Sequence, residues 1–222
     1  MQTHGVNLLR LLQLADSALP IGGLAHSFGL ETLIEEGQLT APDLLSYFQD
    51  QLSECLFLDA VFCRNAHSRG LAGAPTGDLD AQLSARCPAR ESRDASLTLG
   101  RRFLALLRSL ESAASIQALP PADESHFAVA FGYVGGALDF DTDATVGAFL
   151  HQNIAAGISV CQRLLPFGQL DAAALAWDLK PNILEATAKS VGLAPSEVSI
   201  FNHFLELSSM RHPMLPTRLF VS

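Results

Sequence analysis

The stretch TAPDLLSYFQDQLSECLFLDAVFCRNAHSR, residues 40–69, contains both a helix start signal and a long run of helix-compatible residues. Thr40 supplies a capping hydroxyl, and Pro42 suits the first turn of a helix. Asp43 places an acidic group near the positive end of the helix dipole. The stretch therefore predicts one long helix over about residues 42–69.

The composition of the whole chain extends this prediction to the fold class. The 222 residues include 38 leucines and 31 alanines but only 9 valines and 7 isoleucines. Leucine and alanine favour helices, whereas the β-branched residues favour strands. A chain of this length can bury about 70% of its unfolded surface. We therefore predict an all-α fold, a single-domain helical bundle of about eight to ten helices spanning residues 1–222.

Glycine, proline and capping residues set the other helix boundaries. The glycine-rich segment 70–77 is predicted to connect two helices and not two domains. Prolines end the last helix, so the C-terminal tail, residues 211–222, is predicted to be irregular. The remaining predicted helices cover residues 6–15, 28–36, 78–87, 89–115, 126–138, 142–165, 169–191 and 195–210.

The charge and the cysteines exclude several classes of function. The net charge is −9 and the chain has only two lysines, so it lacks a general affinity for nucleic acid or anionic membranes. The apolar N-terminal run has no preceding basic segment, which argues against a signal peptide, and no apolar stretch reaches membrane-spanning length. Four cysteines without paired spacing indicate free thiols in a reducing compartment. We expect a cytoplasmic protein.

Catalytic and metal-binding motifs are missing from the sequence. It contains no phosphate-binding loop, no dinucleotide fingerprint, no zinc-protease motif and no nucleophile elbow. Cys63 and His67 lie four residues apart on one predicted helix, but two ligands do not complete a structural metal site. We predict a core thiol beside a surface histidine, no catalytic residue and no metal site.

Two further features leave alternatives open. The first is a series of arginines on one predicted helical stripe, which forms either a solvated face or a patch that docks an acidic partner. The second is the loop at Pro20, Gly22 and Gly23, which is either a plain turn or a surface that another backbone approaches closely. The arginines of the stripe are Arg86, Arg90, Arg93, Arg101 and Arg108.

The segment LLQLADSALPIGGLAHSFGLE, residues 11–31, resembles the N-terminal signature of the UreF family of urease accessory proteins, LLQLxxPxLPxGxFxxSxGLE. The similarity continues in order through the chain, from residue 8 to 222, and is weakest over residues 70–87. The matching segments are ARESRDASLTLG (89–100), HFAVAFGYVGGAL (126–138), LLPFGQLD (164–171), SMRH (209–212) and RLF (218–220).

This resemblance implies an all-α assembly factor without enzymatic activity. Such a protein dimerises and joins the accessory proteins UreD, also called UreH, and the GTPase UreG in a complex that loads nickel into apo-urease. GTP hydrolysis would belong to UreG, and this chain would act as scaffold and gate. The resemblance implies no tightly held cofactor, because nickel would pass through or beside the protein without storage.

The resemblance also implies partner-binding roles for individual residues. The N-terminal signature provides Pro20, Gly22, Gly23, His26, Ser27, Gly29 and Glu31, the central block Arg90, Glu91 and Arg93, and the tail Arg211, His212 and Arg218. His26 stands where many members have tyrosine, and it adds a group that titrates near neutral pH. Pro213 and Val221 also depart from the family pattern, in place of a glutamate and a basic residue.

Functions from other classes remain as alternatives. The main alternative is a helical small-molecule-binding or regulatory domain, which would have no need of the segment 211–222. A DNA-binding repressor is disfavoured by the acidic charge balance. A helical enzyme is unsupported because spacing identifies no nucleophile, base and orienting residue.

Overall fold

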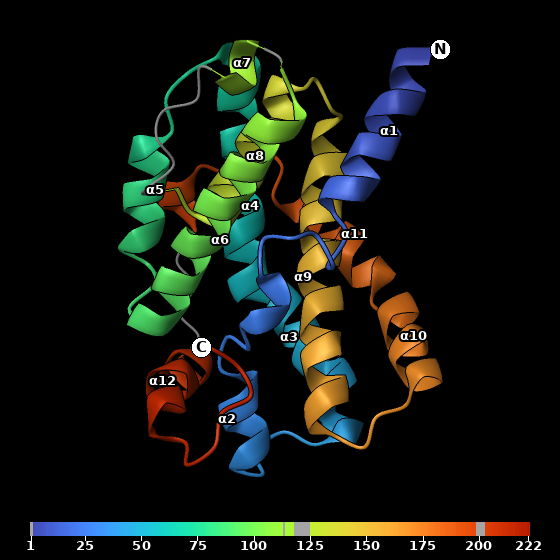
Figure 1. Ribbon diagram of the computed structural model, residues 1–222, viewed down its shortest axis with the longest axis vertical. Coiled ribbons are helices and arrows are strands. Elements are labelled where there is room, and N and C mark those ends of the chain that lie inside the picture. Colours follow the sequence, from blue (N-terminus) through green and yellow to red (C-terminus); the bar gives the residue numbers. More distant parts are fainter. Residues whose placement is uncertain (1, 113, 118–124, 199–202) are drawn as a thin grey trace.

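The computed structural model describes residues 2–112, 114–117, 125–198 and 203–222, and all regular elements within these ranges are helices (Figure 1). The α-helices are α1 (Gln2–Leu14), α2 (Leu30–Glu35), α3 (Leu44–Ser53), α4 (Cys55–Ala72), α5 (Gly77–Ser84), α6 (Arg90–Leu110), α7 (Ala114–Gln117), α8 (Phe127–Ala137), α9 (Thr142–Leu164), α10 (Gln169–Asp178), α11 (Lys180–Lys189) and α12 (His203–Arg211). Short 3-10 turns are η1 (Gly23–Ala25), η2 (Ala41–Asp43), η3 (Pro195–Glu197) and η4 (His212–Met214). The all-α prediction is confirmed.

Two of the predicted long helices are each divided. The helix predicted over residues 42–69 is broken at Glu54, whose backbone angles, φ −121° and ψ −99°, are not helical. The helix predicted over 169–191 is divided at Leu179 because Pro181 occupies the first turn of a new helix, α11. The two divisions and the separate four-residue helix α7 bring the number of α-helices in the described ranges to twelve.

The last helix also differs from its prediction. Pro195 begins the 3-10 turn η3 and not a long helix, and α12 begins at His203. The helix predicted over residues 195–210 falls partly, and the break predicted at residues 118–123 wholly, outside the described residues. The tail after Arg211 contains only the turn η4, so its predicted irregularity is confirmed.

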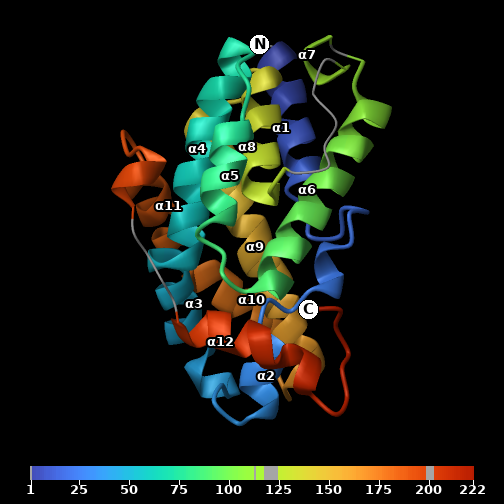
Figure 2. The ribbon, with the colours of Figure 1, turned by 90° about the vertical axis from the view of Figure 1, so that its left-hand side faces the viewer.

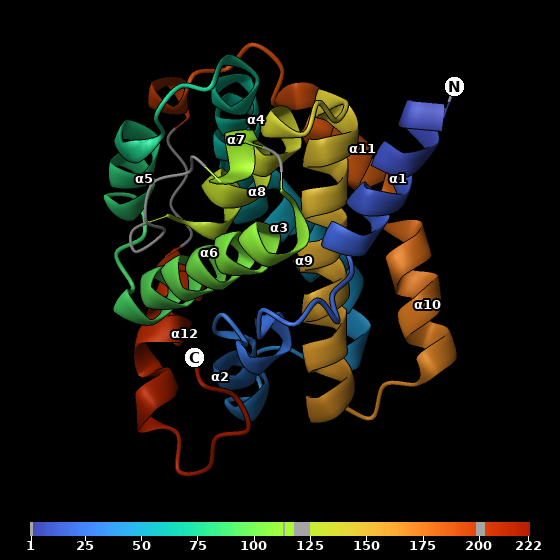
Figure 3. The same cartoon turned by 45° about the horizontal axis from the view of Figure 1, so that its top comes forward.

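Helix α8 forms the centre of the bundle and is buried on nearly all sides. Nine of its eleven residues are buried, and it packs between α4, α6 and α9 (Figure 3). Glycines of α8 lie where this helix meets α4. A Cβ atom at Gly132 would lie 2.0 Å from the Cys63 carbonyl oxygen, and one at Gly136 would lie 2.0 Å from the His67 carbonyl oxygen. The two backbones therefore touch through glycines.

His67 lies in this contact and was wrongly predicted to be on the surface. Only 1% of the residue is exposed, because it faces the turn between α8 and α9. Its Nε2 lies 2.9 Å from the Phe140 carbonyl oxygen, and its Nδ1 lies 3.3 Å from the Thr142 hydroxyl. Cys63 is fully buried, as predicted for a core thiol. His67 is thus a hydrogen-bonded core residue.

The two ends of the chain occupy different parts of the molecule. Helix α1 and the N-terminus lie at one end of the bundle, and α10 and α11 lie along the same side (Figures 1 and 2). Helices α2 and α12 lie toward the other end, with the C-terminus close to both (Figure 2). This arrangement brings the N-terminal signature and the tail together.

Candidate functional site

The second part of the N-terminal signature, residues 20–31, contacts two different parts of the chain. Its first half faces α6: Gly22 has φ 84°, and Arg102 donates to the Ile21 carbonyl oxygen at 3.2 Å. A Cβ atom at Gly22 would lie 2.4 Å from Arg102 Nη1. Pro20 is exposed, and nothing lies within 4 Å of where a Gly23 Cβ would be. The group that approaches Gly22 is the Arg102 side chain and not another backbone, so the structure favours the plain turn over close backbone approach at both glycines.

The second half of the signature binds the end of the tail through backbone hydrogen bonds. Val221 N–H donates to the Ala25 carbonyl oxygen at 2.8 Å, and Ser27 N–H donates to the Ser222 carbonyl oxygen at 2.5 Å. The Ser27 hydroxyl donates to the same oxygen at 2.9 Å. His26 Nδ1 lies 2.7 Å from the Ser222 hydroxyl. The chain end is therefore paired with the loop before α2.

Burial decides the charge state of His26. Removal of the ring from water, with the Arg102 guanidinium nearby, lowers the pKa of His26 below its ordinary value. The imidazole is therefore neutral at neutral pH. The titration near pH 7 that the sequence suggested for this position is shifted to lower pH, and the ring serves as a neutral hydrogen-bonding partner of the chain end.

Glu31 is the central polar contact between the signature and the tail. The residue is only 2% exposed, and its two carboxylate oxygens accept hydrogen bonds from three tail residues. His212 Nε2 lies 2.7 Å from Oε2, Leu219 N–H lies 2.6 Å from Oε1, and Phe220 N–H lies 3.3 Å from Oε2. Hydrogen bonds to a buried carboxylate are stronger than neutral ones. Glu31 thereby holds both the beginning and the end of the tail.

Phe220 anchors the tail through apolar contact. Its side chain is buried in the same cluster as the bundle core, and the Arg163 guanidinium lies 5.7 Å from the ring centroid. Arg163 also donates to the Leu24 carbonyl oxygen at 3.1 Å, which ties α9 to the signature. The hydrogen bond to Leu24 therefore holds the Arg163 guanidinium over the Phe220 ring, where a cation–π interaction is favourable. Phe220 and Glu31 together explain why the tail packs against the body.

Helix α12 connects the tail to the central block of the sequence. The Ser92 and Ser209 hydroxyls lie 2.9 Å apart, and the Glu206 carboxylate accepts from Ala89 N–H at 2.6 Å, at the N-terminus of α6. Gly29, with φ 88°, lies against α12, where a Cβ atom would be 3.0 Å from the Ser209 hydroxyl. The signature, α12 and α6 are therefore in mutual contact.

The charged residues predicted in the central block do not make these contacts themselves. Arg90 is 80% exposed at its side chain and pairs with Asp94 one turn along the helix. Arg93 donates to the Cys87 carbonyl oxygen at 3.0 Å, and Glu91 is half-buried. Arg90 thus remains available at the surface beside α12, whereas Arg93 supports the turn before α6.

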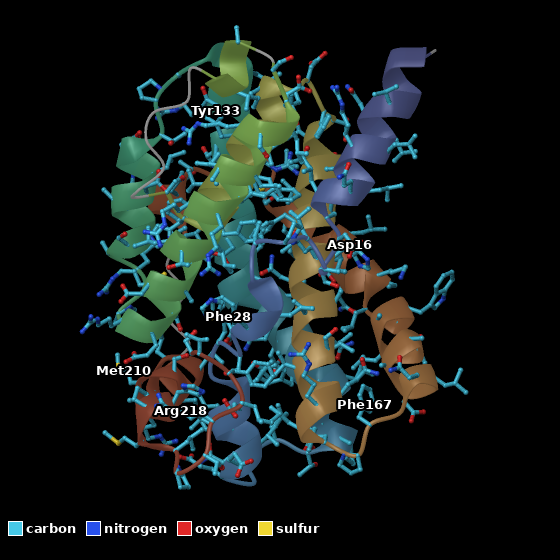
Figure 4. All side chains as sticks on the ribbon, viewed as in Figure 1. Asp16, Phe28, Tyr133, Phe167, Met210 and Arg218 are labelled. Carbon is cyan, nitrogen blue, oxygen red and sulfur yellow. The ribbon has the colours of Figure 1, made fainter. Side chains whose placement is uncertain are left out.

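The predicted tail residues divide in the same way. His212 is buried against Glu31, and Arg211 pairs with Glu36 at 2.7 Å on the surface. Arg218 is exposed, and within the described parts of the chain it has no hydrogen bond or ion pair. Its position beside Met210 is visible in Figure 4. Ser27, Gly29, Glu31 and His212 therefore position the tail, and Arg218 is presented to solvent.

Helix α12 and the tail, which carries Arg218, also present exposed apolar side chains. We call this surface the tail face and define it by Phe204, Leu207, Met210, Met214, Leu219 and Val221, all of which are exposed. They come from α12 and the tail, at the end of the bundle near α2 (Figures 2 and 4). Apolar residues gathered on one face indicate a protein-binding surface.

Across the described residues no three His, Cys, Asp or Glu side chains are placed to hold a metal ion. None of the helices in these ranges combines the length and hydropathy needed to cross a bilayer. The exposed apolar side chains of the tail face are typical of a docking surface.

Sequence reasoning missed four residues that build this region: Glu206, Ser209, Phe220 and Ser222. Their roles depend on contacts with residues more than one hundred positions away in the sequence. The only available signal was the resemblance itself, which included Ser209 and Phe220 within matching segments. Periodicity could not identify them, because Phe220 and Ser222 lie in the irregular tail, and Glu206 and Ser209 of α12 contact the start of α6, which is distant in the sequence.

Comparisons with known proteins agree with these features. The family model described as UreF matches residues 40–180. The chain is 31% identical to the urease accessory protein UreF of Nostoc sp., over 97% of this chain and 96% of that protein. It is 30% identical to the UreF of Geobacillus kaustophilus, over 97% and 98% of the two chains. The helical fold, the joined signature and tail, and these similarities lead to one conclusion: the chain belongs to the UreF family of urease accessory proteins.

Proposed function

We propose that this accessory protein is a scaffold without enzymatic activity that joins UreD, also called UreH, and the GTPase UreG in a complex that inserts nickel into apo-urease. In this role it couples GTP hydrolysis by UreG to assembly of the metal centre. The main support is the tail face, whose exposed apolar side chains lie on α12 and on the tail, which also carries the exposed Arg218. A surface of this kind favours a protein partner over a small substrate.

The docked position of the tail in the free chain determines what kind of surface a partner would meet. Phe220 and Glu31 already hold the tail against the body, so the partner would meet a preformed surface. Preformed surfaces lose less conformational entropy on binding than disordered ones. We therefore propose that UreD/UreH recognises the docked tail together with α12, and that UreG is recruited to the resulting complex.

The proposal includes a homodimer in the cytoplasm. Helix α1 supports it with an exposed apolar face at the opposite end of the chain from the tail face. A second copy that packs on this face would cover it and leave the tail face free. The exposed residues of α1 are Val6, Leu8, Leu9 and Leu12.

Nickel would pass through or beside the protein without tight storage. The absence of a group of three ligands among the described residues is compatible with this. Calorimetry of the isolated protein with nickel tests it directly. One tight site per monomer would contradict the proposal.

Co-expression with UreD/UreH and UreG tests the scaffold role. Arg218→Ala should leave the fold intact and reduce the amount of UreG that co-purifies, together with urease activation. Lys189→Ala is the matched control, because Lys189 is an exposed cation on α11, away from the tail. Unchanged co-purification of both partners with Arg218→Ala would overturn the role given to the tail face.

A further inference from the structure

A cavity of about 180 Å³ lies between the N-terminal signature and the bundle, and the scaffold role does not use it. Its wall includes the signature at Phe28, α12 at Leu205, and aromatic side chains from the core helices. The aromatic residues from α3, α8 and α9 are Tyr47, Phe48, Phe127 and Phe149. A concave, mainly apolar space with a few polar groups is the usual form of a small-ligand site.

Asp59 is the most unusual residue in this wall. It lies on α4 within the apolar surroundings, and among the described residues it makes no hydrogen bond and no ion pair. Removal from water raises the pKa of Asp59 to about 7. Asp59 is half-buried, and a carboxyl group that is partly removed from water without a donor or cation is costly to keep. A ligand that supplies both would remove this cost.

The other ionisable groups of the wall offer no free cation. Burial and the neighbouring Asp59 raise the pKa of Cys55 and Cys87 to about 12, so both thiols stay protonated. The Glu206 carboxylate borders the same space. Arg86 also lines the cavity, but it donates to the Gln82 and Pro195 carbonyl oxygens and lies over the Phe62 ring. The ligand itself must therefore bring positive charge.

The ligand chemistry follows from these groups. The described residues offer no set of three metal ligands, so a chelated metal ion fits poorly. Aromatic rings suit an apolar body and stabilise a nearby cation. We propose that the cavity binds a protonated primary amine with an apolar body, whose ammonium group donates to Asp59 while the body packs on the rings of Tyr47, Phe48 and Phe127.

Binding of benzylamine to the full chain tests this proposal. We expect benzylamine at millimolar concentration to raise the melting temperature and to give a saturable calorimetric signal. Benzyl alcohol, which has the same shape without the charge, should do neither. Equal effects of the amine and the alcohol, or no saturable binding of benzylamine, would overturn the proposal.

Two variants locate the site. Asp59→Asn should weaken benzylamine binding by about tenfold or more, the loss expected for a hydrogen-bonded buried charge. Asp178→Asn, an exposed aspartate on α10, is the matched control and should bind normally. Ala156→Phe should fill the cavity and abolish binding even if Asp59→Asn folds poorly. Undiminished binding in a folded Asp59→Asn or Ala156→Phe protein would place the amine elsewhere.

Metal ions provide the remaining arm of the test. Ni²⁺ or Zn²⁺ binding that is lost in both Cys55→Ser and Cys87→Ser, without any response to benzylamine, would assign the cavity to a metal and contradict the amine proposal. Failure of the amine proposal would leave partner recruitment through Arg218 unaffected, because that surface lies outside the cavity.

Discussion

The contact between α4 and α8 and the contact between the tail and the signature are both buried, but they are built in opposite ways. Helices α4 and α8 meet through glycines, with backbone against backbone and no room for a methyl group. The tail meets the signature through backbone hydrogen bonds, the Glu31 carboxylate and one aromatic anchor, Phe220. The first contact is steric and the second is mainly polar.

This difference separates global stability from local docking. Helices α4 and α8 contribute to the centre of the core, so any change in their spacing affects the whole bundle. The tail is the last segment of the chain and can detach without opening that core. Local opening of this kind requires less free energy than global unfolding. The tail is therefore suited to regulation, and the glycine contact is suited to rigidity.

The largest effect is expected from Gly132→Ala in the steric contact. The new methyl group would overlap the Cys63 carbonyl oxygen, and both backbones are fixed by their helices. We expect a loss of about 3 kcal/mol or more in the free energy of unfolding, measured by chemical denaturation.

Gly77→Ala is the control for this prediction. It lies at the start of α5, where nothing is within 4 Å of the added carbon, so stability should change by less than about 1 kcal/mol. Similar losses in the two variants would show that close approach to the Cys63 carbonyl oxygen does not determine the effect.

The next effect concerns Glu31→Gln in the polar contact. The amide removes one acceptor and places an N–H₂ group opposite donors of the tail, which should weaken docking by about 2–3 kcal/mol. Hydrogen exchange at Leu219 and Phe220 should accelerate far more than exchange in α8. Glu36→Gln, which disturbs only the exposed pair with Arg211, should cost less than about 1 kcal/mol. Uniform acceleration over the whole protein would contradict the separation of the two regions.

The steric region was largely predictable from sequence, whereas the polar region was not. The helix over residues 126–138 was predicted within one residue at each end, because a continuous apolar run ended at acidic turn residues. The break at Glu54 had no sequence signal, since no proline or glycine marks it. The division at Leu179 did have a sequence signal in Pro181, but the prediction of one helix over residues 169–191 did not use it.

The candidate site shows why the remaining features could not be predicted. Local sequence rules describe neighbours within a few residues, but Glu31 contacts partners 181 to 189 positions away. The resemblance identified Glu31, His212 and Arg218 together as partner-binding residues. The structure assigns them different roles, because Glu31 and His212 are buried against each other while Arg218 faces solvent.

A smaller effect with the opposite sign is expected from Asp59→Asn. The pKa of Asp59 is raised to about 7 in the folded chain, so the ionised form is favoured by unfolding. The group therefore costs no stability below its ordinary pKa, the cost grows as the pH rises from that value to about 7, and it stays constant above about 7. Cys55, Cys63 and Cys87 face it as neutral thiols, and Glu206 borders the cavity, so no facing cation offsets the cost.

Without amine, Asp59→Asn should stabilise the protein by ~1–3 kcal/mol at pH 8 and by much less at pH 4. Thermal unfolding over this pH range measures the difference from the unmodified chain. An equal change at both pH values would mean that packing, and not ionisation, decides the effect.

The smallest effect on stability is expected from Arg218→Ala, and this makes it the most informative variant for function. The side chain is exposed and makes no hydrogen bond or ion pair within the described residues, so the free energy of unfolding should change by less than about 0.5 kcal/mol. Hydrogen exchange of the tail should also stay unchanged, in contrast to Glu31→Gln. If partner capture falls under these conditions, the loss arises at the surface of a correctly docked tail. If tail exchange accelerates as well, Arg218 contributes to docking, and reduced capture would then report detachment of the tail.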